Sequence, residues 1–282
     1  FTQLAIEFLH PAMPRELKPT DQGHLISTVN ALIRMMISYR IDEITMDPNA
    51  NFIQAMGGYG NQMGETDAFE FIVIPKDGKE KAAMADMFTQ VEKIKRYGFT
   101  NAEFERAKTE YVSMVERYYN ERNTRQSQSY AQEYYRHYLD GEPIPGIEFE
   151  YEYVKAVLPQ LPVQIINQLA QQYITDNNIV ISYIGKENSD IVSVPTQEEV
   201  LEIFNAVKAS EIEAPVEETF DRPLVENAPV AGSIVKEKFN KKLGTTEWTL
   251  SNGIKVVIKP TEFKNDEINM SMESEGGLSK VA

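Results

Sequence analysis

The segment Gly98-Phe99-Thr100-Asn101-Ala102-Glu103-Phe104-Glu105-Arg106-Ala107-Lys108 contains the end of one predicted helix and the beginning of the next. Gly98 is well placed to end the first helix, because glycine readily adopts the backbone conformation that follows a last helical turn. Thr100 and Glu103 have the spacing of a capping box, in which each side chain accepts a hydrogen bond from the backbone N–H of the other residue. The sequence therefore predicts two consecutive helices that meet at Gly98.

Apolar side chains recur at helical spacing on both sides of this segment. Upstream, a helix that begins near Asp77-Gly78 has one apolar face, formed by Met84, Met87, Phe88, Val91 and Ile94. Downstream, the predicted inner face of the second helix comprises Phe104, Ala107, Tyr111, Val115 and Tyr118. Each helix is therefore expected to pack one side against a core.

Short apolar runs elsewhere in the chain predict strands. The expected strands are residues 3–9, 52–59, 68–74 and 179–184, with a turn at 60–64. A further helix is expected to begin at Thr20-Asp21 and to stop at Asp47-Pro48-Asn49. Helical character after Thr100 is expected to continue through Tyr138, and shorter helices are expected at 147–158, 162–175 and 196–208. Helices in series beside antiparallel strands indicate an α+β fold, in which an antiparallel sheet packs against several helices.

The composition changes after the last of these helices. Residues 210–237 contain seven acidic residues, two basic residues and three prolines, which indicates an extended linker. Beyond it, Ser251-Asn252-Gly253 predicts a hairpin turn, and residues 268–272 a third strand. We therefore expect a first domain at 1–190, a helix and acidic, proline-containing linker at 191–237, and the beginning of a second, similar domain at 238–282. We also expect the chain to be an internal segment of a longer protein, with its unfinished second domain loosely held.

Charge and composition narrow the classes of function. The chain has 28 basic and 43 acidic residues, a formal net charge of −15, which disfavours binding to nucleic acids and to anionic membranes. The absence of cysteine excludes disulfides and thiol nucleophiles. Its longest apolar stretch, 29–41, is interrupted by Arg34 and Arg40, so no membrane span is expected.

Three segments resemble the insulinase/pitrilysin family of zinc peptidases, which includes the mitochondrial processing peptidases. Residues 98–108 resemble the family's G-F-T-x-x-E-L-x-x-A-K helix entry, residues 36–43 its L-x-x-R-L-x-E helix end, and residues 250–256 its L-x-N-G-L-x-V hairpin. The resemblance implies four similar α+β domains whose two halves enclose a peptide-sized chamber, with residues 1–190 as the second, non-catalytic domain. It also implies that the parent protein is a zinc-dependent metalloendopeptidase with peptides or unfolded proteins as substrates. Bacterial relatives are often exported, so a periplasmic location is expected.

Zinc hydrolysis in this family is expected to use His-x-x-Glu-His, because two histidines four residues apart on a helix reach one ion and the glutamate activates its water. The histidines here are His10, His24 and His137, and they do not form this motif. We therefore predict no catalytic, cofactor-binding or metal-binding residue in this chain, and expect zinc to be bound outside it. Each histidine is interpreted as a surface or loop residue, with a shared site of all three as the alternative. An arginine and a tyrosine that bind substrate C-termini in some family members would fall near Met46 and Ile53, and neither fits.

Other candidate signals have both a structural and a functional interpretation. The tyrosines either form a peptide-gripping face or divide between core and surface; they are Tyr111, Tyr118, Tyr119, Tyr130, Tyr134, Tyr135 and Tyr138. The segment Gly57-Gly58-Tyr59-Gly60 lacks the lysine of a phosphate loop and predicts a hairpin or bulge. The alternating glutamates of residues 148–152 are expected to be solvated, and Ser127 and Ser129 lack a hydrolase elbow motif.

The leading hypothesis is a non-catalytic, chamber-forming and substrate-enclosing segment of a zinc metalloendopeptidase. The alternative within the family is a non-enzymatic peptide-binding or assembly subunit. A free-standing peptide-binding module is a third class, and it would require an exposed strand edge.

Overall fold

The computed structural model describes residues 2–188, 191–216, 225–262, 268–274 and 276 of the chain. The chain divides into two compact units, Phe1–Thr219 and Phe220–Ala282. Within the described residues, no helix combines the length and the apolar character that crossing a membrane requires.

The first unit contains an antiparallel sheet with the strand order β2-β3-β1-β4. Its strands are β1 (Gln3–Pro11), β2 (Phe52–Met63), β3 (Thr66–Pro75) and β4 (Ile179–Ile184). The four predicted strands are confirmed, but the turn predicted at 60–64 is wrong because residues 60–63 continue β2. The chain reverses at Gly64, whose φ of +59° suits a tight hairpin turn.

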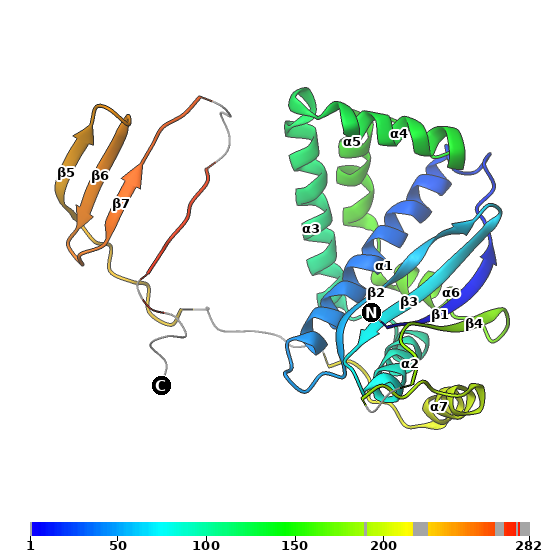
Figure 1. Ribbon diagram of the computed structural model, residues 1–282. Helices are drawn as coiled ribbons and strands as arrows, with labels where there is room; N and C mark the ends of the chain where they lie inside the picture. The colour runs from blue at the N-terminus through cyan, green and yellow to red at the C-terminus, as the bar shows by residue number, and fades with distance from the viewer. Residues whose placement is uncertain (1, 189–190, 217–224, 263–267, 275, 277–282) are drawn as a thin grey trace. The chain divides into compact units, whose positions relative to one another are not determined.

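Helices make up the second layer of this unit (Figure 1). They are α1 (Asp21–Thr45), α2 (Glu80–Tyr97), α3 (Asn101–Asn120), α4 (Ser127–Asp140), α5 (Ile147–Val157), α6 (Val163–Tyr173) and α7 (Gln197–Ala209), with short 3-10 turns at Arg122–Thr124 and Leu158–Gln160. Helices α1, α3 and α5 run side by side. The α+β class predicted from the sequence is confirmed.

Strand alternation determines which face of the sheet meets the helices. Leu4, Ile6 and Phe8 of β1 are almost completely buried, as are Phe69 and Phe71 of β3. These side chains belong to one hydrophobic core with residues of α1, α2 and α6. The helices therefore cover one face of the sheet, and the residues of opposite parity lie on the other face.

The predicted junction between two helices is confirmed. The hydroxyl of Thr100 accepts a hydrogen bond from the Glu103 amide at 3.2 Å, and the Glu103 carboxylate accepts one from the Thr100 amide at 2.7 Å. Gly98 has a φ of +68°, and a Cβ there would lie 2.4 Å from the side chain of Asn167. Glycine is required at this position for its conformation and for the close approach of α6.

The end of α1 packs against this junction through Arg40. Its guanidinium donates to Glu103 Oε2 and to the carbonyl of Gly98, both at 2.8 Å, and it lies over the Phe99 ring. Arg40 is only 9% exposed, so this ion pair is shielded from water. Two of the three segments that carry the family resemblance, 36–43 and 98–108, are therefore in direct contact.

The inner face predicted for α3 is only partly correct. Phe104, Ala107 and Val115 are buried and Tyr111 is half-buried, but Tyr118 is 51% exposed. The prediction for Tyr118 is wrong because α5 packs on the side of α3 that carries the neighbouring Tyr119, whose ring contacts Tyr151.

Helix α7 packs against α2 within the first unit. The rings of Phe88 and Phe204 lie 5.2 Å apart in an edge-to-face arrangement, and Lys81 pairs with Glu199 at 2.6 Å. The compact unit accordingly extends to Thr219. The division into 1–190, 191–237 and 238–282 in terms of family domains stays a prediction.

The second unit contains a three-stranded antiparallel sheet with the order β5-β6-β7. Its strands are β5 (Ile234–Asn240), β6 (Thr245–Leu250) and β7 (Lys255–Ile258). The hairpin predicted at 251–253 is confirmed, and Gly253 has a φ of +85°. The strand predicted at 268–272 is wrong, since those residues have no strand and Ile268 is 94% exposed. The third strand is β5, whose first four residues fall within the linker predicted at 191–237.

Candidate functional site

The three histidines lie on different elements, each with its own local contacts. Nε2 of His10, on β1, is 2.8 Å from the carbonyl oxygen of Tyr173. His24, on α1, stacks edge-on against Tyr153 with ring centroids 4.5 Å apart, and burial lowers its pKa. Nδ1 of His137, on α4, is 2.6 Å from the carbonyl oxygen of Glu142.

The described residues do not fit a zinc site. They contain no group of three or more His, Cys, Asp or Glu side chains arranged to hold a metal ion. A catalytic zinc requires three such protein ligands and an open position for water. We therefore derive no metal-dependent step from these residues.

Ser127 and Ser129 lie on α4 with His137, but Nδ1 of His137 contacts the backbone carbonyl of Glu142.

The positions that align with a substrate-terminus site carry exposed apolar side chains. Met46 follows the last turn of α1 and is 80% exposed, and Ile53 near the start of β2 is 66% exposed. Neither side chain can bind a carboxylate. Gly57-Gly58-Tyr59-Gly60 lies in β2 of the β2–β3 hairpin, in agreement with the structural interpretation of this segment.

The tyrosine set is more exposed than expected. Tyr134, Tyr135 and Tyr138 of α4 are 58%, 63% and 80% exposed, and α4 has no buried residue. Tyr111 and Tyr119 are half-buried, and the Tyr119 ring stacks on Tyr151 at 4.4 Å. The expectation that half of the set belongs to the core is wrong, because the core of the described unit does not reach α4.

The face of the sheet opposite the helices is the most distinctive surface of the first unit. We call it the open face and define it by Glu7, Met56, Glu70, Ile72, Val180 and Ile184. None of these side chains belongs to the hydrophobic core. Met56, Val180 and Ile184 are 47%, 40% and 65% exposed. The open face thus presents apolar side chains to its surroundings beside two carboxylates.

The two glutamates face each other across the central strands. Glu7 of β1 and Glu70 of β3 are directly opposite in the antiparallel register. The side-chain amide of Gln62 donates to one oxygen of each carboxylate at 2.9 Å. Burial and the charge of Glu70 raise the pKa of Glu7. Like charges directly opposite each other in a sheet are destabilising, so this pair is retained at a cost.

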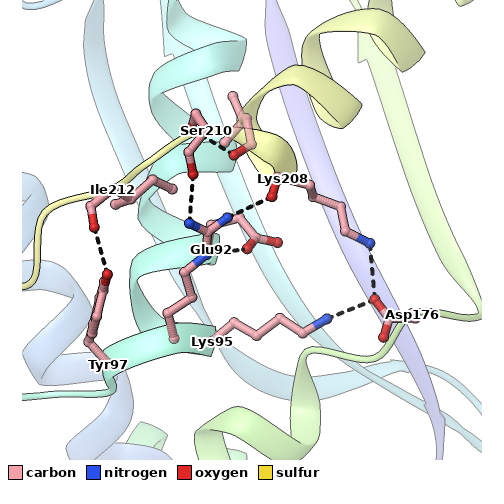
Figure 2. Close-up of polar contacts among 9 residues, drawn as sticks. Glu92, Lys95, Tyr97, Asp176, Lys208, Ser210 and Ile212 are labelled. Carbon is pink, nitrogen blue, oxygen red and sulfur yellow. Dashed lines mark hydrogen bonds and ion pairs between the residues drawn. The ribbon is translucent and has the colours of Figure 1, made fainter.

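A polar cluster holds the end of α7 against α2, and Figure 2 shows its contacts. The Arg96 guanidinium donates to the backbone carbonyls of Ser210 at 2.8 Å and Lys208 at 2.7 Å. The Tyr97 hydroxyl donates to the carbonyl of Ile212 at 2.7 Å. We call these contacts the α7 latch. Because the latch binds backbone atoms, it fixes the path of the chain after α7 independently of those side chains.

A second set of charges supports the latch. Asp176, in the loop after α6, pairs with Lys95 at 2.8 Å and with Lys208 at 3.0 Å. Hydrogen bonds from these two lysines lower the pKa of Asp176 to about 2. Figure 2 shows both lysines reaching the same carboxylate from different helices. The loop after α6, helix α2 and helix α7 are therefore tied together at one point.

Comparison with known proteins gives one related sequence and several related folds. No family model matches the chain. The Arabidopsis thaliana protein "Zinc protease PQQL-like" is 30% identical over 192 residues, which are 68% of this chain and 20% of that protein. The chain therefore spans about a fifth of the length of this curated relative.

Two solved structures share the fold. The periplasmic protease PqqL from Escherichia coli superposes with a TM-score of 0.67 at 14% identity, over 94% of this chain and 29% of PqqL. The "predicted insulinase family protease" from Yersinia pestis superposes with a TM-score of 0.60 at 13% identity, over 74% of this chain and 44% of that protein. Sequence and fold together therefore place the chain among the insulinase/pitrilysin-type zinc proteases.

Proposed function

We propose that this chain is a non-catalytic, chamber-forming segment of a zinc metalloendopeptidase that encloses peptide or unfolded protein substrates. The observation that carries the proposal is the open face of the sheet, which in the described part of the chain presents apolar side chains and two carboxylates that lie outside the hydrophobic core. Exposed apolar side chains that gather on one face are typical of a surface that binds a ligand or another polypeptide.

The relationship to zinc proteases supports a protease as the parent protein. The sequence has only three histidines, at positions 10, 24 and 137, so it does not contain a His-x-x-Glu-His motif. Zinc would then be held by residues outside this chain, and catalysis would take place there. PqqL is a periplasmic protease. This supports an exported or periplasmic location for the present protein.

Metal analysis and a cleavage assay on the purified chain test the proposal. We expect no stoichiometric zinc after dialysis and no chelator-sensitive cleavage of an unfolded protein. Tight zinc binding at one ion per chain, together with cleavage, would contradict the proposal.

A non-enzymatic subunit of the same family is the second candidate, because the dispersed histidines fit it equally well. The sequence of the full-length protein distinguishes the two. An intact His-x-x-Glu-His motif there supports the peptidase, and its loss supports a binding or assembly subunit.

A further inference from the structure

The carboxylate pair of the open face occupies the centre of the sheet. Glu7 and Glu70 belong to the two central strands, β1 and β3. Their neighbours in the same cross-strand row are Gly58 on β2 and Val180 on β4. Gly58 itself has no side chain, but the Arg34 side chain of α1 lies against it, with Nε 3.0 Å from the position that a Cβ would take. Val180 cannot donate a hydrogen bond to Glu7. Glu7 and Glu70 are each partly exposed on the open face.

The negative charge of the pair is not neutralised within the described part of the chain. No basic side chain there lies within ion-pair distance of Glu7 or Glu70, and Gln62 is a neutral donor. Arg34, whose side chain lies against Gly58, donates to the carbonyl of Tyr59. The pair therefore offers strong acceptors to a cation that approaches the open face.

The next row of the open face consists of Met56, Ile72, Ala5 and Ser182, and it is apolar on β2, β3 and β1. Met56 and Ile72 are directly paired there, two residues along the strands from Gly58 and Glu70. Because side chains of an extended strand repeat on one face every two residues, an extended polypeptide can place a basic residue over the acidic row and an apolar residue over this one. The open face thus matches an extended polypeptide that carries a basic residue next to apolar residues.

We propose that the open face binds an extended polypeptide through an arginine or lysine that lies between Glu7 and Glu70, with apolar neighbours on Met56 and Ile72. The inference rests on the proposed substrate-enclosing function and specifies the class of substrate. A guanidinium fits best, since its planar set of N–H donors can bridge two carboxylates. The incoming cation takes the acceptor positions that the Gln62 amide now occupies.

Peptide binding to the complete 282-residue chain tests this inference. The probe is a fluorescent peptide with one arginine between leucine and valine residues, and the matched peptide has citrulline in place of arginine. We expect the arginine peptide to bind about tenfold more tightly at low salt, and this preference to shrink as salt rises. Equal affinity for both peptides would overturn the inference.

Charge-removing variants locate the site. We expect Glu7→Gln and Glu70→Gln each to weaken the arginine peptide about tenfold and to leave the citrulline peptide unchanged. Glu202→Gln makes the same change of net charge on the exposed surface of α7 and should alter binding less than twofold. A loss of affinity that is equal in all three variants would show a general charge effect and overturn the site.

Two control measurements test whether unfolding or metal binding accounts for the result. Gln is nearly isosteric with Glu and removes a repulsion, so loss of binding in these variants will not come from unfolding, which circular dichroism checks. Magnesium or calcium that binds the pair tightly and excludes the peptide would also overturn the inference. Cleavage by the chain would refute the proposed function but leave the peptide preference intact, so the two failures are distinguishable.

Discussion

At the scale of single residues, the unusual feature is that two carboxylates, those of Glu7 and Glu70, lie directly opposite each other among apolar side chains of the sheet. Glu7 is partly buried, and both its burial and the neighbouring Glu70 raise its pKa. A carboxyl whose pKa is higher in the folded than in the unfolded state lowers the free energy of unfolding once it ionises. The penalty is absent at a pH below the unfolded value and is complete above the folded value.

Glu7→Gln should therefore stabilise the chain at neutral pH. We expect a gain of about 0.2–1 kcal/mol, the size of a cross-strand pair effect. The gain should vanish near pH 3, where the Glu7 carboxyl is protonated in both the folded and the unfolded chain. Urea denaturation at both pH values checks this. Destabilisation by Glu7→Gln at pH 7 would show that the pair contributes to stability instead.

Glu103 caps α3 together with Thr100 and also pairs with Arg40, and substitutions can separate these two roles. Thr100→Ala removes one capping hydrogen bond and should cost about 1 kcal/mol. Glu103→Ala also leaves the buried guanidinium of Arg40 without its carboxylate and should cost about 3–5 kcal/mol. Denaturant unfolding measures both. Equal costs for the two variants would mean that Arg40 is satisfied without Glu103.

At the scale of elements, features that depend on neighbouring residues could be predicted from the sequence, whereas contacts between residues far apart in the chain could not. The capping box at Thr100 and the glycine stop at Gly98 were predicted because each depends on residues within one turn. The Glu7–Glu70 pair was missed, since it depends on the register between strands 63 positions apart in the chain. The alternation in 3–9 shows that Glu7 lies opposite the buried face, but no local pattern identifies its partner. The strand β5 was missed because Lys236, Glu237 and Lys238 hide its alternation.

The contribution of the α7 latch to the stability of α7 can be tested by substitution. Arg96→Met keeps the aliphatic stem and removes the donors to the carbonyls of Lys208 and Ser210. We expect amide hydrogen exchange in α7 to accelerate about tenfold, since hydrogen bonds to a charged group contribute about 1.5–3 kcal/mol. Lys93→Met on the same helix is the control and should leave exchange unchanged. Equal exchange in both variants would contradict the latch.

Helix α4 should contribute little to the stability of the chain. Its Tyr134 and Tyr138 are exposed and Phe104 of α3 is buried, so the same loss of aromatic surface should have different effects. We expect Tyr134→Ser and Tyr138→Ser each to change the free energy of unfolding by less than about 0.5 kcal/mol. Phe104→Ala should cost about 3–5 kcal/mol. A large cost at Tyr138, measured by urea unfolding, would indicate packing in solution that the structure does not show.

At the scale of the whole molecule, the proposed function rests on the fold and on the open face of the sheet. The fold is shared with insulinase-type proteases. The open face is the surface that we propose contacts the substrate, and the described residues contain no group of three or more His, Cys, Asp or Glu side chains that could hold a metal ion. Function at this scale depends on how the first unit faces the rest of the full-length protein.

Site-specific photo-crosslinking in the full-length protein tests this central claim most directly. A photoreactive amino acid at Ile72 of the open face is compared with one at Ser113, an exposed residue of α3 outside the open face. With an unfolded protein substrate present, the account predicts substrate crosslinks from position 72 and none from position 113. Crosslinks from position 113 alone, or from neither position while the substrate is being cleaved, would contradict it.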